Sequence, residues 1–397
     1  MSRWRALFLL SLAELLGMSL WFSASSVAPA LRAEWGLAES ATGWLTLAVQ
    51  MGFVVGTLLS AILNLPDVLR AHRLVAAAAL LAACANAAIA LFAKGATLTI
   101  LLRFATGLCL AGVYPPGMKI IASWFRRGRG LALGALIGAL TLGKASPYLL
   151  NVFGGEAWRG KLLFVSLLAA IGGLIVLFVG EGPFAAPTAP FDARQAARVF
   201  RERGVRLANL GYFGHMWELY AMWTWTPVMI RASLDRAGAS PALAEIAAFL
   251  VIGSGAIGCV AAGFLADRAG RTLVASAAMV VSGACCLTVG FLFGGSPSLL
   301  LFLAVVWGMT VVADSAQFSA CVTELADPRY LGTALTMQTC VGFLLTTASI
   351  ELVSFLAGVV GWRYAFLALA PGPFLGAAAM LRLRALPEAA RLADGRR

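Results

Sequence analysis

A small set of ionisable side chains lies inside long apolar stretches of the sequence. They are Glu14, Arg103, Lys144, His215, Glu218 and Asp314. In hydrocarbon such groups are costly, so they usually carry protons, pair with one another or bind a charged substrate. Enzymatic chemistry would need a nucleophile beside a base, or several metal ligands together. The two histidines, His72 and His215, lie far apart in the topology given below, so we expect no enzyme, no metal and no cofactor.

Lys144 offers the most specific chemistry, because an ammonium group at mid-membrane needs an anionic partner. At helical spacing Lys144 shares a face with Thr141, Tyr148 and Asn151, whose side chains can form hydrogen bonds. Our leading hypothesis is that a small anionic substrate supplies the missing charge. The alternatives are a permanent ion pair with Glu14, Glu218 or Asp314, and a part in coupling.

Aromatic residues accompany His215 and Glu218 along one predicted helix, and Tyr220 and Trp223 are included among the candidate substrate contacts. An aromatic wall suits a planar substrate, although tryptophans at the ends of spans also act as ordinary interfacial anchors.

Proton coupling has its own candidates, Glu14, His215, Glu218 and Asp314. A carboxyl group removed from water can bind a proton near neutral pH, and imidazole titrates there without help. The alternatives are a fixed ion pair or hydrogen bond for each carboxyl group, and a neutral buried imidazole for His215.

The elements that carry these residues are membrane spans. Of the 397 residues, 61% are hydrophobic and only 12% are charged, a ratio that excludes a soluble core, a nucleic-acid-binding protein and a secreted disulfide domain. Apolar runs of about 20 residues recur along the chain, and each is long enough to cross a bilayer. Twelve predicted helices cover residues 6–30, 41–64, 73–93, 97–122, 130–153, 161–180, 207–231, 243–266, 273–293, 298–322, 331–357 and 363–383.

The orientation follows from the Lys and Arg residues, which favour the inner side of a membrane. About 20 of the 30 fall on the side of both termini, so the termini are predicted to be cytoplasmic, in a bacterial inner membrane. A Pro-rich and Arg-rich segment at 182–206 divides the chain into two six-helix bundles, residues 1–181 and 207–397. Residues 191–203 are predicted either as an amphipathic surface helix or as a solvated linker.

The two halves repeat each other at an offset of 201 to 204 residues. The matching landmarks are Arg5 and Glu14 with Arg206 and His215, Gly107 with Gly308, Gly130 with Gly332, Trp158 and Arg159 with Trp362 and Arg363, and Asn64 with Asp267. Because six spans separate equivalent positions, the halves are parallel repeats, as in one large class of transporters.

The loop Gly263–Arg271, with the sequence GFLADRAGR, resembles the signature of the major facilitator superfamily. The first-half copy at Ser60–Arg73 is degraded, with Asn64 in place of the aspartate, whereas the segment Arg103–Gly107 resembles the fourth-span motif of that family. This resemblance implies an all-α membrane fold of twelve helices, whose two bundles rock around a central cavity lined by the faces described above. It also implies a cytoplasmic latch at Asp267, Arg268 and Arg271, and for Arg103 either helix packing or a part in proton coupling.

These observations together predict a secondary active transporter of a small organic or inorganic anion, with proton symport as the coupling. Its partners would be a small molecule, protons and membrane lipid, without nucleic acid, and we expect a monomer. The alternative is a proton-coupled antiporter that exports a cationic or amphiphilic compound and uses the buried carboxylates as counter-charges.

Overall fold

The computed structural model describes residues 1–37, 41–125, 128–153, 157–185, 192, 194, 200–327 and 331–397. Residues 186–191, 193 and 195–199, which belong to the predicted linker (182–206) and in part to the predicted surface helix (191–203), lie outside these residues. The long helix after the linker begins at Arg203 and ends at Arg236, beyond the 207–231 predicted for it.

Helices make up both halves. The first half contains α1 (Arg3–Met18), α2 (Ser23–Ser26), α3 (Ala28–Trp35), α4 (Ala41–Ile62), α5 (Leu65–Val68), α6 (Ala71–Phe92), α7 (Ala96–Leu110), α8 (Tyr114–Trp124), α9 (Arg129–Phe153) and α10 (Trp158–Val176). The second half contains α12 (Arg203–Arg236), α13 (Pro241–Gly253), α14 (Gly255–Ala269), α15 (Arg271–Thr288), η2 (Val289–Leu292), α16 (Pro297–Thr310), α17 (Ser315–Leu325), α18 (Leu331–Val359), α19 (Trp362–Ala365), η4 (Phe366–Leu369), α20 (Pro371–Arg384) and η5 (Pro387–Gly395).

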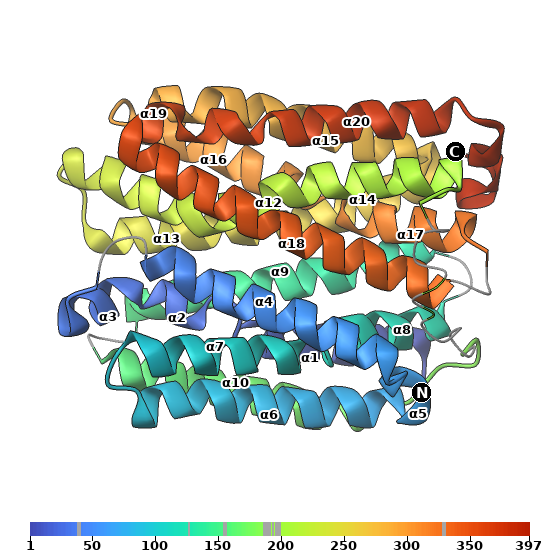
Figure 1. Cartoon of the computed structure of the whole chain (residues 1–397), viewed down its shortest axis with the longest axis horizontal. Helices are drawn as coiled ribbons and strands as arrows, with labels where there is room; N and C mark the ends of the chain where they lie inside the picture. Colours follow the sequence, from blue (N-terminus) through green and yellow to red (C-terminus); the bar gives the residue numbers. More distant parts are fainter. Residues whose placement is uncertain are drawn as a thin grey trace.

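The long helices run side by side along the longest axis of the molecule, and the two halves lie against each other (Figure 1). Both termini lie at one end, which we call the terminal end; the opposite end is the distal end. Two seams join the halves, because α9 packs along α13 and α14 while α4 packs along α18.

Ten segments of the described chain are long and apolar enough to cross a membrane. The other two predicted spans correspond to α1 to α3, which is interrupted, and to α12, which carries several polar and charged residues. The prediction of an all-helical membrane protein is therefore confirmed.

Five predicted spans are broken within the described residues, where continuous helices were expected, and of these the twelfth span is divided into α19, η4 and α20. The first stops at Met18 and resumes at Ser23, the fourth is interrupted between α7 and α8, the eighth at Ser254 and the tenth between α16 and α17. Pro115 and Pro116 stand in the first turn of α8, where the missing amide hydrogens cost nothing. These breaks free backbone groups in the middle of the bundle.

Equivalent glycines make equivalent contacts in the two halves. A side chain at Gly107 would collide with the backbone of Val49, and one at Gly308 would collide with the backbone of Val251. The same close packing of small residues thus supports both repeats.

Candidate functional site

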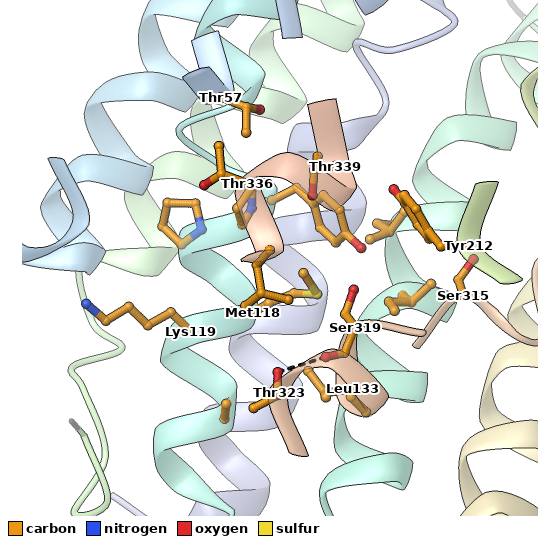
Figure 2. A pocket seen from close by; sticks show the side chains of 18 of the residues that line it. Thr57, Met118, Lys119, Leu133, Tyr212, Ser315, Ser319, Thr323, Thr336 and Thr339 are labelled. Atoms are coloured by element: carbon orange, nitrogen blue, oxygen red, sulfur yellow. Dashed lines mark hydrogen bonds between the residues drawn. The ribbon is translucent and has the colours of Figure 1, made fainter. Parts of the chain in front are cut away.

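A cavity of about 440 Å³ lies between the halves. It extends from buried Lys144 and Trp223 to exposed Arg129 and Glu181, so it opens toward the terminal end. Figure 2 shows hydroxyl groups from both halves on its walls, among them Thr57, Ser315, Thr336 and Thr339. The cavity therefore offers a space for a small molecule with an apolar body and some hydrogen-bonding groups.

Four buried rings close the cavity on its distal side, and we call them the aromatic plug: Trp21, Phe53, Tyr220 and Phe343. Phe53 and Phe343 have ring centroids 4.6 Å apart, and Trp21 and Tyr220 have centroids 5.5 Å apart. Each of these two contacts pairs a first-half ring with a second-half ring, so the plug holds the halves together above the cavity.

Lys144 of α9 lies where the cavity meets the aromatic plug, and its side chain is 3% exposed. Its Nζ donates a hydrogen bond of 2.7 Å to the hydroxyl oxygen of Tyr220. The same Nζ lies 4.4 Å from the ring centroid of Trp21 and 5.0 Å from that of Trp223. No carboxylate of the described residues lies within 4.0 Å of it. The ammonium group is thus held by ring faces and a phenol instead of a counter-ion.

The break between α1 and α2 fixes the position of Trp21. The chain between α1 and α2 leaves carbonyl oxygens without helical partners, and Arg103 of α7 donates to those of Leu20 and Trp21 and to that of Leu45. Arg103 is fully buried and makes no salt bridge with a described carboxylate. This geometry gives Arg103 a packing role, and its predicted part in proton coupling stays a prediction.

The other predicted contacts on α9 do not reach the cavity in this conformation. Thr141 donates to the carbonyl of Ile137 in its own helix and packs against α14 at Gly255. Tyr148 is buried, and it is absent from the cavity lining. From Thr141 to Asn151 a helix rises about 15 Å. Of the four predicted contacts on α9, Lys144 alone is in the cavity lining.

Asn151 instead belongs to a polar network at the distal end. Its amide donates to the carbonyl of Ser26 and to the carboxylate of Glu245, at 2.8 Å each. Glu245 of α13 also pairs with Arg231 of α12. Because Asn151 belongs to the first half and Glu245 to the second, this network closes the distal side together with the aromatic plug.

Glu14 is buried in α1 beside the bare backbone of Gly117 in α8. Neither carboxyl oxygen has a hydrogen-bond partner among the described residues. Lys144 is the cation whose charge acts on Glu14, and Tyr114 is a further polar neighbour. A buried carboxyl group without donors has no fixed structural partner, which keeps Glu14 among the candidates for proton coupling.

His215 and Asp314 lie together in the second half, beside the cavity. Their Nδ1 and Oδ1 atoms are 2.8 Å apart, both side chains are 2% exposed, and the other ring nitrogen of His215 lies 2.9 Å from the hydroxyl of Ser315. His215 lines the cavity. The structure thus joins two proton-coupling candidates into one pair.

Glu218 is different, because its Oε1 accepts three hydrogen bonds inside the second half. The donors are the hydroxyl of Ser282, the thiol of Cys286 and the indole N–H of Trp307. Glu218 does not line the cavity. Such a set of donors fixes the carboxylate and favours the alternative of a structural hydrogen-bond acceptor.

The predicted latch residues separate into two groups. Asp267 crosses between the halves, since its Oδ2 accepts from the backbone N–H of Leu131 (3.2 Å) in the first turn of α9. Arg271 stays within the second half, where it pairs with Glu324 of α17 at 2.6 Å, and Arg268 stacks over Phe264. A carboxylate at a helix N-terminus is stabilised by the unpaired amides and the helix dipole.

The segment after α20 folds back over the same loop. Arg396 donates to the carbonyl of Asp267, and the backbone N–H of Ala393 donates to Glu324 at 3.0 Å. Leu392 is fully buried beneath it. The last helical turn of the chain therefore covers the loop that carries Asp267.

A family model described as Major Facilitator Superfamily matches residues 9–349 and 208–397. The chain belongs to the Major Facilitator Superfamily. It is therefore a multi-pass membrane transporter of a small molecule, not an enzyme, and the resemblance seen in the Gly263–Arg271 loop is confirmed.

Individual relatives of the superfamily are distant. The chain is 24% identical over 311 residues to a gallate transporter of Pseudomonas putida, covering 67% of this chain and 66% of that protein. It is 24% identical over 243 residues to the MFS transporter asaE of Aspergillus flavus, covering 58% and 53%. The chain thus spans between about half and two thirds of the length of these relatives.

The fold matches the structure of the proton:xylose symporter XylE bound to 6-bromo-6-deoxy-D-glucose. The TM-score is 0.73 at 14% identity, covering 96% of this chain and 95% of the other. At this identity the similarity establishes the superfamily fold and leaves the substrate open.

Sequence reasoning missed two contributors to this superfamily member's closed distal side, Arg231 and Glu245. Neither was among the candidate site residues. The available signal was their opposite charge at the facing ends of α12 and α13, which a short connection joins. Trp21 was aligned with Glu14 on one face, but its place beside Lys144 depends on the break after α1.

Proposed function

We propose that this transporter is a proton-coupled symporter of a small anion, and that Lys144 binds the anion. The observation that carries the proposal is the position of the Lys144 ammonium group at the closed end of the cavity, without a carboxylate within 4.0 Å in the described part of the chain. Burying an ammonium group costs at least ~2.5 kcal/mol even on lenient insertion scales. An anionic substrate would offset that cost when it binds.

The names of two similar proteins support an anionic substrate and proton coupling. Gallate, named for one relative, is a small aromatic carboxylate, and the XylE title names a proton symporter. Glu14 and the pair of His215 and Asp314 are the proposed proton carriers.

The alternative is export of a cationic compound in exchange for protons. The ring faces of Trp21, Tyr220 and Trp223, which surround Lys144, are the observation in its favour, because such faces also attract a substrate cation.

A thermal-shift screen in detergent separates the two functions. The panel contains acetate, benzoate, 3,4,5-trihydroxybenzoate, nitrate and tetraphenylphosphonium; a ligand at 100 times its Kd should stabilise the fold by about 2.7 kcal/mol. We expect an anion to stabilise the wild type, Lys144→Ala to lose that response while staying folded, and Lys144→Arg to keep part of it. Lys161→Ala in α10, outside the cavity lining, is the matched control.

Two results would overturn the anion proposal. One is stabilisation by the lipophilic cation alone. The other is unfolding of Lys144→Ala that a second change at Glu14, Glu218 or Asp314 rescues, because Lys144 would then be a structural ion-pair partner.

Proton coupling is tested in proteoliposomes. An inward proton gradient should accelerate uptake of the identified anion, and Glu14→Gln or His215→Gln should exchange substrate without responding to the gradient. Glu388→Gln in exposed η5 is the control carboxylate. Uptake that ignores both pH and a protonophore would contradict symport.

We also propose that the terminal end faces the cytoplasm, in a bacterial inner membrane, so that the cavity described above opens inward. In a variant without native cysteines, Ala237→Cys at the distal end should react with an impermeant maleimide from outside cells and Ala385→Cys should not. Both positions are exposed. The reverse pattern would refute the orientation.

A further inference from the structure

Seven of the eleven tryptophans fall into two groups according to whether the indole N–H has a hydrogen-bond acceptor. Five of them donate to an acceptor, with distances of 2.5 to 3.0 Å: Trp124 to Gly180, Trp158 to Glu34, Trp217 to Ala368, Trp225 to Ile350 and Trp307 to Glu218. Trp21 and Trp223 are buried, and in the described part of the chain their Nε1 atoms have no partner. Buried polar groups are normally paired, so two orphan donors need an explanation.

Both orphan donors lie beside the same ammonium group. The rings of Trp21 and Trp223 have their centroids 4.4 and 5.0 Å from Nζ of Lys144. Trp223 lines the cavity, whereas Trp21 lies behind the lining in the aromatic plug, so a ligand reaches its N–H only by entering the space beside Lys144. The other five indoles lie elsewhere in the fold. Two unpaired indole donors of the described residues thus lie together beside Lys144, at the closed end of the cavity.

The groups gathered there are donors. Lys144 uses one of its three hydrogens on Tyr220, and the hydroxyl of Tyr220, having accepted that bond, can still donate its own hydrogen. Two indole N–H groups add to these, since indole nitrogen donates and never accepts. Glu14 acts on Lys144 through charge but accepts no hydrogen bond from any of these groups. A group of hydrogen-bond donors without acceptors can bind an anion. A cation at the same place could interact only with the aromatic ring faces.

We propose that the indole N–H groups of Trp21 and Trp223 bind the anion next to Lys144 and Tyr220, and that the substrate is a monocarboxylate. This inference rests on the proposed function and narrows it. A carboxylate presents two oxygens with about four acceptor positions, which matches an ammonium group, two indoles and a phenol. Its single negative charge matches the one cation at the closed end, while the hydroxyl-lined cavity takes the body of the molecule.

Trp21 belongs to the first half and Trp223 to the second. A carboxylate held by both would connect the two bundles through one ligand. The N–H donors would thus make substrate affinity depend on how closely the halves approach, which a contact to Lys144 alone would not do.

The test removes one N–H at a time and keeps the ring. Trp21 or Trp223 is replaced by 3-benzothienylalanine, in which sulfur stands for the indole N–H, and Trp217, whose N–H is bound to a backbone carbonyl away from the cavity, receives the same replacement as control. The probes are benzoate and 3,4,5-trihydroxybenzoate, with benzamide as the neutral match, and the readout is the Kd from thermal shift or calorimetry. Loss of one hydrogen bond to a charged group should weaken carboxylate binding about ten- to hundredfold at positions 21 and 223. At position 217 the Kd should stay unchanged.

The outcomes distinguish this inference from the function on which it rests. If Lys144→Ala abolishes carboxylate binding but both benzothienylalanine variants bind like the wild type, the proposed function stands and the indole ligands are refuted. If only position 223 responds, Trp21 is not a ligand. If nitrate binds and no carboxylate does, the monocarboxylate is refuted. If no anion in the panel stabilises the wild type, both proposals fail together.

Discussion

Two loops at the terminal end occupy equivalent places in the repeat, yet they are built differently. In the second half Asp267 stands in the last turn of α14, just before α15 begins, and its carboxylate accepts from the N-terminus of α9 in the other half. The first-half loop carries Asn64, which has a left-handed backbone (φ 49°) and makes no side-chain hydrogen bond among the described residues. Asn64 and Gly332 of α18, the repeat counterpart of Gly130, both line the cavity.

The two halves also differ one helical turn earlier, at Gly263 of α14 and at Ser60 of α4. Gly263 lies against the backbone of Gly130, where any side chain would collide, while its counterpart Ser60 already has a side chain and lines the cavity. The seam with glycine and a carboxylate is closed at the terminal end, and the seam with serine and an amide is open. This difference predicts that the two helix connections decide along which seam the cavity opens, which the following variants test.

The largest loss of stability is expected when Gly263 in the second half is replaced by serine, the residue at the equivalent first-half position 60. In Gly263→Ser the new side chain would collide with the backbone of Gly130, and overpacking of this kind costs about 1 to 3 kcal/mol. Thermal unfolding in detergent should show the loss as a lowered Tm. Ser60→Gly, at the cavity wall, should unfold within a degree or two of the wild type; an equal loss in both variants would contradict the asymmetry.

Removing the charge of Asp267 should have the next largest effect. Asp267→Asn keeps the shape but loses the attraction of a carboxylate for a helix N-terminus, worth about 0.5 to 2 kcal/mol. We expect impaired transport with little change in substrate Kd, because Asp267 lies outside the cavity lining. Lost binding in a folded variant would show that Asp267 is not a latch.

The reverse exchange, Asn64→Asp, gives the open seam the missing carboxylate. An exposed carboxylate near a helix N-terminus contributes about 0.3 to 1 kcal/mol, so the population open at the terminal end should fall about two- to fivefold. Spin labels on the exposed ends of α4 and α18 would measure this as a shift toward shorter distances. An unchanged distance distribution would mean that Asn64 does not control this seam.

The smallest change in stability is expected at the distal end, where the equivalent Trp-Arg pairs of the two halves make different contacts. In the first half Arg159 and Trp158 donate to Glu34 of α3, and these hydrogen bonds lower the pKa of Glu34 below its usual 4.5. In the second half Trp362 and Arg363 contact aromatic rings instead.

A lowered folded-state pKa means that ionised Glu34 stabilises the fold above pH 4.5 and that this contribution disappears as the pH falls through the folded-state pKa. Glu34→Gln should therefore have a slightly lower Tm than the wild type at pH 7, and the difference should shrink below pH 4.5 and vanish as the pH falls through the folded-state pKa. A difference that persists in acid would assign the effect to packing. Arg363→Gln should show no such dependence on pH.

Much of the fold could be predicted from the sequence, because apolar length, charge bias and the offset between halves are properties of the chain itself. Helical spacing likewise placed Lys144 in the membrane interior, and the structure brings it together with Tyr220 and Trp223. Periodicity gives the face of a helix but not the depth at which a cavity ends. For that reason Asn151 was grouped with Lys144, although it lies in the distal network with Glu245.

The remaining errors come from contacts between distant segments. No local pattern shows that a helix stops at Met18 because Arg103 can bind the freed carbonyl groups, or that Glu218 is surrounded by Ser282, Cys286 and Trp307. These arrangements depend on three or more helices meeting, and a single sequence does not reveal which helices meet.

The segment that folds back after α20 has a practical consequence for handling the protein. Arg396 and Ala393 are bound to the Asp267 loop and to Glu324, so an affinity tag or a fluorescent fusion joined directly after Arg397 would pull on the loop that holds α9. Joined through a short linker before Met1, which is exposed, the same tag leaves those contacts intact. A lower yield or transport rate for the C-terminal fusion than for the N-terminal fusion would show that the tag disturbs these contacts.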